Sequence, residues 1–126
     1  MAEIENATKI EAIVDGYFSM WNELDASRRR AVTADTWTAD ARYVDPMFSA
    51  QGLEGLDAMV RGVHEQFPGH QFRLVGPIDA HHDRARWNWE LVPVAGGAPV
   101  ATGVDFAVLA DDARLREVTG FFHQPA

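Results

Sequence analysis

The chain has 126 residues, of which 47% are hydrophobic, carries a formal net charge of −8 at pH 7 and contains no cysteine. Lys9 is the only lysine, so the sequence lacks the basic stripe that neutralises phosphate groups, and neither nucleic acid nor an anionic membrane is an expected partner. The lack of cysteine excludes disulfides, thiolate metal sites and thiol nucleophiles.

Length and the lack of repeats or linkers predict one globular domain over residues 1–126. Residues 1–5 are acidic and do not resemble the apolar core of a signal peptide, and no apolar run is long enough to span a bilayer. We therefore expect a cytoplasmic protein.

Two helices are predicted before the first strand. The first has apolar residues at spacings of three and four, typical of one buried face: Ile10, Ile13, Val14, Tyr17, Phe18, Trp21 and Leu24. Asp25 or Ser27 is expected to cap a second helix that runs to about Asp35. Residues 36–40 read as a turn of helix before the first strand, with Trp37 in the core.

Residues 41–46 predict a short strand that ends at a carboxylate. Pro46 restricts Asp45 to extended geometry and cannot donate to a sheet ladder, so the Asp45 side chain is held at the strand end. That position suits a general base. The competing interpretation is a plain Asp-Pro turn.

A third helix is predicted after a second short strand within residues 47–51. Gly52 and Gly55 precede its apolar stripe, and Pro68-Gly69 ends it; the stripe comprises Leu56, Met59, Val60, Val63 and Phe67. His64 lies at the edge of the stripe, where a structural role is favoured over a catalytic one.

From Gln71 onward apolar and polar residues alternate with a period of two, which indicates strands. Turns at residues 95–98 and 111–113 predict an antiparallel meander of three long strands after Asp83. His81 and His82 are expected on opposite faces of a strand, which argues against joint metal ligation, so we expect no metal.

The strand at residues 99–109 has two faces of very different bulk. One carries Val100, Val104, Phe106 and Val108, and the other carries Ala101, Gly103, Asp105, Ala107 and Leu109. If helices cover the face with small residues, space remains there and Asp105 becomes a carboxyl group in an apolar cavity. The bulky face then lies on the outside of the sheet and favours a homodimer through it.

Helices followed by a long antiparallel sheet indicate an α+β fold. The order of elements and the residues at their junctions resemble the nuclear transport factor 2-like superfamily, which includes SnoaL-like polyketide cyclases and ketosteroid isomerases. The resemblance covers nearly the whole chain. It is strongest around Tyr17 and at three short stretches: Val44-Asp45-Pro46, Leu74-Val75-Gly76-Pro77-Ile78 and Gly103-Val104-Asp105-Phe106. It implies a cone-shaped roll whose N-terminal helices pack on a curved mixed, mostly antiparallel sheet enclosing one apolar pocket.

The resemblance to the isomerases also implies roles for three residues. Asp45 stands at the position of the base, and Tyr17 and Asp105 at the positions of the oxyanion donors. A carboxylic acid kept neutral by an apolar site is the feature for which ketosteroid isomerase is known. The implied reaction is proton transfer alpha to a carbonyl group in a small apolar substrate, without a cofactor.

Eight residues are expected to line the pocket: Trp37, Met59, Val63, Trp87, Trp89, Gly103, Val118 and Phe122. The sequence departs from the isomerases at two places. Val63 and His64 occupy the third-helix region where a supporting tyrosine is common. Trp87 and Trp89 are larger than usual, whereas Ala101 and Gly103 are smaller, so the pocket is expected to differ in shape.

Two alternatives to the isomerase hypothesis remain open. The first is a non-catalytic protein that binds a hydrophobic ligand between aromatic side chains, with the carboxyl groups only orienting it. The second is a SnoaL-like polyketide cyclase, which would use the same cone with other residue roles.

Overall fold

A computed structural model describes residues 2–123 of the chain, with the side chains of residues 2–6 excepted. This part contains three helices and six strands. In chain order they are α1 (Ala2–Asn22), α2 (Ala26–Thr36), β1 (Trp37–Val44), β2 (Ser49–Gln51), α3 (Gly52–Gln66), β3 (His70–His81), β4 (Arg84–Pro93), β5 (Ala101–Leu109) and β6 (Leu115–Phe122).

Helix α1 buries the predicted apolar face against the sheet. Val14, Tyr17 and Trp21 are each less than 5% exposed. Leu24 is an exception to the prediction, because α1 ends at Asn22 and the Leu24 side chain is 77% exposed. The apolar spacing thus continues for two residues beyond the end of the helix.

The junction between α2 and β1 lies earlier than the sequence suggested. Asp25 is the N-cap of α2 and accepts a hydrogen bond from the Arg28 N–H, as predicted. The expected helical turn at residues 36–40 is wrong, since β1 already begins at Trp37. Trp37 pairs with Leu115 of β6, and this distant contact overrides the local preference of a polar segment.

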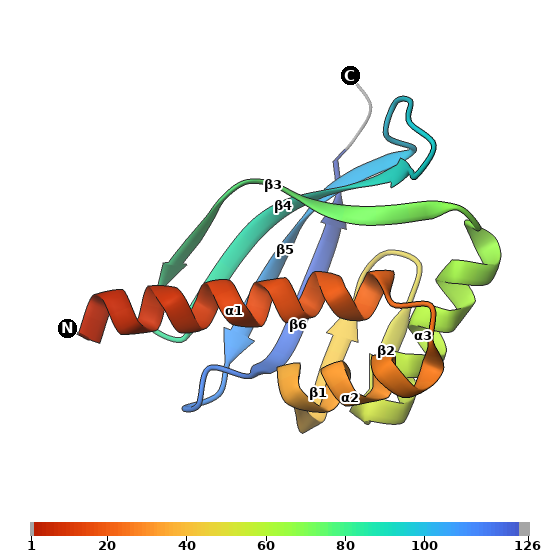
Figure 1. The fold of residues 1–126 in the computed structure, drawn as a ribbon. Coiled ribbons are helices and arrows are strands. Elements are labelled where there is room, and N and C mark those ends of the chain that lie inside the picture. The colour runs from red at the N-terminus through yellow and green to blue at the C-terminus, as the bar shows by residue number, and fades with distance from the viewer. Residues whose placement is uncertain (1, 124–126) are drawn as a thin grey trace.

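The six strands form one mixed sheet in the order β2-β1-β6-β5-β4-β3. β1 and β6 run parallel, and the other neighbours are antiparallel, including the predicted meander β4-β5-β6. The sheet does not close into a barrel. It curves around α1, which lies across its concave side, while α3 covers β1 and β2 (Figure 1). The fold is therefore α+β, with three helices on a curved mixed sheet, as the sequence predicted.

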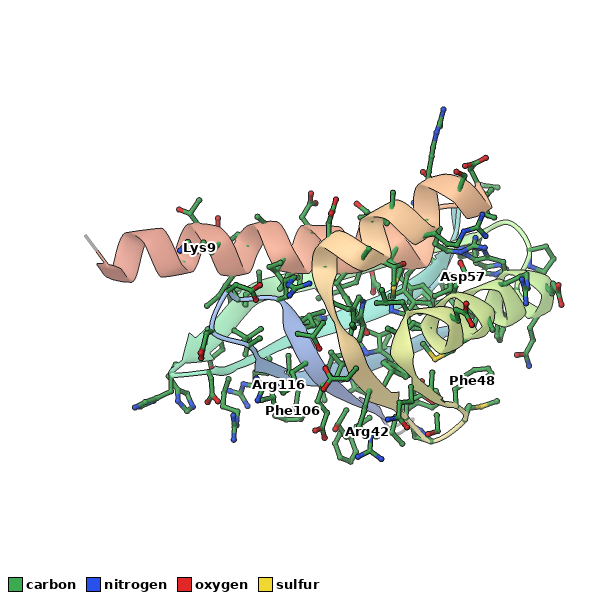
Figure 2. All side chains as sticks on the ribbon, turned by 90° about the horizontal axis from the view of Figure 1, so that it is seen from below. Lys9, Arg42, Phe48, Asp57, Phe106 and Arg116 are labelled. Carbon is green, nitrogen blue, oxygen red and sulfur yellow. The ribbon has the colours of Figure 1, made fainter. Side chains whose placement is uncertain are left out.

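Strand β5 has the two faces that the sequence predicted. Gly103, Asp105 and Ala107 are buried beneath the helices, whereas Phe106 is 43% exposed. Phe106 projects from the side of the sheet away from α1, with Arg42 and Arg116 on the same side (Figure 2).

A buried ion pair that the sequence did not indicate joins α2 to α3. Arg29 Nε donates to Asp57 Oδ1 at 2.6 Å, and both residues are less than 10% exposed. Figure 2 shows Asp57 on the side of α3 that faces α2. This pair fixes the two helices that flank β1. Among the described helices, none is long and apolar enough to cross a membrane.

Candidate active site

A cavity of about 110 Å³ lies between α1, α3 and the concave side of the sheet. Its wall is almost entirely apolar and includes Phe18, Trp21, Phe67, Phe72, Trp89 and Phe122. Five polar side chains interrupt this wall: the exposed Gln66, and a cluster formed by Tyr17, Tyr43, Asp45 and Asp105. An apolar cavity with a few convergent polar groups is typical of a small-molecule site.

Asp45 is fixed by three hydrogen bonds just beyond the end of β1. Oδ1 accepts from the backbone N–H groups of Met47, at 2.7 Å, and Phe48, at 2.8 Å. Oδ2 accepts from the Tyr43 hydroxyl at 2.6 Å. The Asp-Pro turn is therefore real, yet the carboxylate also lines the cavity. Three donors therefore hold the Asp45 carboxyl group in one orientation at the edge of the cavity.

Asp105 has a contrasting environment at the centre of β5. It is 3% exposed, and its Oδ2 accepts a 2.7 Å hydrogen bond from the Tyr17 hydroxyl. Burial raises the pKa of Asp105 to about 7, the negative charge of Asp45 contributes in the same direction, and the bond from Tyr17 opposes both. Asp45 thus accepts three hydrogen bonds, whereas burial stabilises the neutral form of Asp105.

Tyr17 and Tyr43 lie between the two carboxyl groups. Burial is the main cause of the raised pKa of each tyrosine, and the nearby Asp105 raises both further. Each hydroxyl also affects the pKa of the other tyrosine. Both therefore remain neutral hydrogen-bond donors at physiological pH.

The sequence did not identify Tyr43 as a site residue. The signal for it is strand alternation, because Tyr43 precedes Asp45 by two positions and so shares its face. Tyr43 is a second buried tyrosine at the site, and it comes from β1. The isomerases commonly carry their supporting tyrosine on the third helix, where this chain has Val63 and His64.

Gly120 of β6 shows how closely these groups gather. A methyl group built on Gly120 would lie 2.9 Å from Asp105 Oδ1, 3.2 Å from Asp45 Cβ and 3.4 Å from the Tyr43 hydroxyl oxygen. Only a residue without a side chain leaves room at this point. The structure thus brings the three predicted residues Tyr17, Asp45 and Asp105 to one end of one cavity.

Of the eight expected pocket residues, Val63, Trp89 and Phe122 line the cavity, and five do not. Trp37 and Trp87 pack behind Tyr17, with ring centroids 5.9 Å and 5.1 Å from its ring. Met59 and Val118 belong to the packed core, and Gly103 is covered by the indole ring of Trp89. An inward position in the sequence pattern places a residue under the helices but does not distinguish cavity wall from packed core.

The histidines lie away from the cavity wall. His64 Nε2 is 2.6 Å from the Trp21 carbonyl oxygen and donates to it, which supports the structural role. His81 and His82 are not on opposite strand faces as expected, because His82 lies in the β3–β4 turn with φ of 50° and the two rings contact each other. Among the described side chains, those of residues 7–123, no group of three or more potential metal ligands is gathered.

No family model matches this sequence, and no curated protein sequence matches it. Solved structures do match. A candidate isomerase of the SnoaL-like family from Agrobacterium tumefaciens is 35% identical, with a TM-score of 0.86 over 93% of this chain and 99% of that protein.

Two more distant structures share the fold. A candidate SnoaL-like polyketide cyclase from Jannaschia is 19% identical, with a TM-score of 0.65 over 87% of this chain and 84% of that protein. A nuclear transport factor 2-like protein with a cystatin-like fold from Novosphingobium aromaticivorans is 15% identical, with a TM-score of 0.76 over 99% of this chain and 86% of that protein. The 35% identity to the Agrobacterium protein over nearly the full length of both chains shows that this chain belongs to the SnoaL-like family, within the nuclear transport factor 2-like fold.

Proposed function

We propose that the chain catalyses proton transfer alpha to a carbonyl group in a small apolar substrate, with Asp45 as the base and Tyr17 and Asp105 as the electrophilic donors. The observation that carries the proposal is the contrast between two carboxyl groups on one cavity. Asp45 accepts three hydrogen bonds, whereas burial raises the pKa of Asp105 to about 7. Two carboxyl groups in such different environments can divide the base and acid roles between them.

Asp45 retains a site for the substrate proton. A carboxylate has about four lone-pair positions, and the bonds from Met47, Phe48 and Tyr43 occupy three of them. The remaining position is on Oδ2, the oxygen that also accepts from Tyr43. In the proposed step the carbon–hydrogen bond breaks, its proton goes to Oδ2, and its electron pair forms an enolate. The reverse transfer at another carbon completes an isomerisation.

Asp105 and Tyr17 would stabilise the negative charge that develops on the enolate oxygen. Asp105 as a neutral acid is a donor in an apolar wall, and Tyr17 donates to it. Donors that are already fixed in a dry site stabilise developing charge more strongly than water does. The step uses these side chains alone, so the proposal includes no cofactor.

The cavity supports a small substrate. Its volume of about 110 Å³ is below the range of roughly 300–1,000 Å³ that is usual for ligand pockets. A compound of one ring suits this space better than a steroid does.

Two further proposals concern partners and location. The exposed outer face of the sheet, with Phe106 and Phe121, supports a homodimer through that face. We propose the cytoplasm as the location, and the net charge of −8 supports a protein that has neither nucleic acid nor an anionic membrane as partner.

Two other functions have specific support. The aromatic wall supports a protein that binds a hydrophobic ligand without turnover. The similarity to a structure described as a candidate SnoaL-like polyketide cyclase supports a cyclase, in which the same base would generate the carbanion for ring closure.

A screen of β,γ-unsaturated ketones and β-keto compounds tests the proposal, with cyclohex-3-enone as the smallest enone. Conversion to the conjugated enone above the buffer rate is the expected result. Ring closure of a β-keto compound would favour the cyclase, and tight binding throughout the panel without conversion would favour the binding protein.

A further inference from the structure

Three buried polar atoms near the cavity end lack hydrogen-bond partners among the described residues. They are Asp105 Oδ1 and the indole nitrogens of Trp87 and Trp89. A buried donor without a partner is costly, and such atoms in a native structure call for an explanation. The three atoms belong to neighbouring strands, since Trp87 pairs with Asp105 and Trp89 with Gly103 across β4 and β5.

Trp89 reaches this position because Gly103 has no side chain. A methyl group built on Gly103 would lie 2.3 Å from the backbone carbonyl oxygen of Phe121, and 2.4 Å from Cζ2 and 2.7 Å from Cε2 of the Trp89 ring. Cε2 is bonded to Nε1, so the indole lies over Gly103 with its N–H edge close to the neighbouring Asp105. Both indole N–H groups lie near enough to the Asp105 carboxyl to lower its pKa, although neither makes a hydrogen bond to it.

The free atoms differ in their access to the cavity. Trp89 and Asp105 line it, whereas Trp87 does not. Trp89 Nε1 and Asp105 Oδ1 are themselves covered while the cavity is empty, so a ligand oxygen reaches them only when the side chains that cover them shift. Gly120 stands opposite Asp105 on β6, and its missing side chain leaves room beside Oδ1. Of the two unpaired indoles, only Trp89 therefore shares a cavity wall with this oxygen.

The hydrogen bond from Tyr17 determines which oxygen of Asp105 carries the proton when the group is a neutral acid. Because Tyr17 donates to Oδ2, the proton of the neutral acid belongs on Oδ1, which has no partner within residues 2–123. Oδ1–H and the Trp89 N–H are then two donors at one end of an apolar cavity. Their complement is an oxygen atom that accepts and does not donate.

We propose that Trp89 Nε1 and Asp105 Oδ1 together form a binding subsite for a carbonyl or enolate oxygen of the ligand. In this refinement Tyr17 no longer donates to the ligand oxygen itself, because its single O–H holds the Asp105 carboxyl group, and Trp89 takes its place as the second donor to the ligand. The subsite adds a contact to the proposed proton transfer. Only the statement that the bound ligand is a substrate rests on that proposed function. Gly103 is a positioning residue, because any side chain at that position displaces the Trp89 ring.

The test uses two probes of matched shape, cyclohexanone and methylenecyclohexane, which differ in the acceptor oxygen. The indole N–H signals of the four tryptophans are followed by ¹H–¹⁵N NMR and assigned with Trp→Phe variants. Cyclohexanone is expected to move the Trp89 signal downfield, as hydrogen bonding does, and methylenecyclohexane is expected to leave it in place.

Affinities of the variants test the same contact independently. Trp89→Phe removes the donor and keeps an aromatic ring, so cyclohexanone should bind about three- to tenfold more weakly, with methylenecyclohexane unaffected. If Trp89→Phe folds poorly, the NMR comparison of cyclohexanone with methylenecyclohexane on the unaltered protein still tests the contact. Trp87→Phe is the matched control, since it removes an unpaired N–H near Asp105 that lies outside the cavity wall.

Equal weakening by Trp87→Phe and Trp89→Phe would overturn the proposal, because the effect would then pass through the charge of Asp105. An unmoved Trp89 signal at saturating cyclohexanone would also overturn it, even if the enone screen shows turnover. A moved signal without any turnover would support the subsite and contradict the proposed proton transfer.

Discussion

The hydroxyl of Tyr43 donates a 2.6 Å hydrogen bond to Oδ2 of Asp45, which lies two residues later at the end of β1. Tyr43 is 4% exposed, so the bond is protected from water on one side. Together with the backbone N–H groups of Met47 and Phe48, it leaves the carboxylate little freedom to rotate.

Tyr43→Phe removes this bond and keeps the ring in the core. A hydrogen bond to a charged group contributes about 1.5–3 kcal/mol, so loss of orientation of the base should lower kcat by roughly ten- to a hundredfold. The KM should change little, because the hydroxyl is directed at Asp45. Steady-state kinetics with the enone found in the screen measure both constants, and an unchanged kcat would contradict this role of Tyr43.

The stability of the protein should depend on pH through Asp105. Its pKa is about 7 in the folded protein and 3.8 in the reference state, so between these values the folded chain holds a proton that the unfolded chain has released. The stability contributed by the neutral acid is complete below about pH 4 and is lost as the pH rises through about 7, by about 4 kcal/mol in total.

Asp105→Asn cannot titrate at this position. Its free energy of unfolding should therefore rise relative to the wild type by that amount between pH 4 and pH 8, as measured by urea denaturation at intervals of pH. The wild-type activity should also fall as the pH rises through about 7. The activity of Asp105→Asn should not show this fall. If the free energies of unfolding of the two proteins differ by the same amount at every pH, Asp105 does not cause the pH dependence.

Gly120→Ala tests whether the two aspartates work across one shared space. The added methyl group would lie 2.9 Å from Asp105 Oδ1 and 3.2 Å from Asp45 Cβ, so the two side chains must move apart. Misplacement of reacting groups by about 1 Å can cost roughly a hundredfold in rate, and we expect a loss in kcat/KM of about that size.

The matched control is Gly62→Ala on α3, where, among the described residues, the new methyl group meets no atom within 4 Å beyond its chain neighbours and local helix backbone. It should leave activity unchanged and stabilise the helix by up to about 1 kcal/mol. Equal activity of Gly120→Ala and the wild type would show that the space beside Gly120 is not part of the site.

How far the sequence predicted the site depended on the range of the interactions involved. The inward position of Asp105 followed from the alternation of small and bulky residues in β5, and Pro46 marked Asp45 as the end of a strand. Both signals are local. The start of β1 at Trp37 was missed because its partner is Leu115, far away in the sequence.

The cavity wall was predicted less well than the polar residues. Trp87 and Trp89 both face inward on β4, yet only Trp89 lines the cavity, since Trp87 packs edge-on against Tyr17. Which inward side chain meets empty space depends on how rings from three elements fit together. Alternation and helical period carry no information about that fit.

The proposed dimer predicts an effect of charge on the outer face. Phe106 and Phe121 are 43% and 53% exposed, and their ring centroids are 6.0 Å apart. Phe106→Glu would replace an apolar ring in the interface with a charged side chain and should weaken dimerisation by roughly tenfold or more. Leu24→Glu, at a site that is 77% exposed, is the control and should not change the sedimentation coefficient. A wild-type monomer in sedimentation velocity would remove the basis of this prediction.

The central claim is that Asp45 takes a proton from a carbon next to a carbonyl group, and hydrogen–deuterium exchange of cyclohexanone in D₂O measures that step directly. The wild-type protein should incorporate deuterium alpha to the carbonyl faster than buffer does. Asp45→Asn, which keeps an oxygen for the Met47 and Phe48 N–H groups, should lower the protein-catalysed rate by roughly two to four orders of magnitude without changing the folded fraction. Equal exchange rates for the folded variant and the wild type, or exchange no faster than buffer with cyclohexanone bound, would contradict the account.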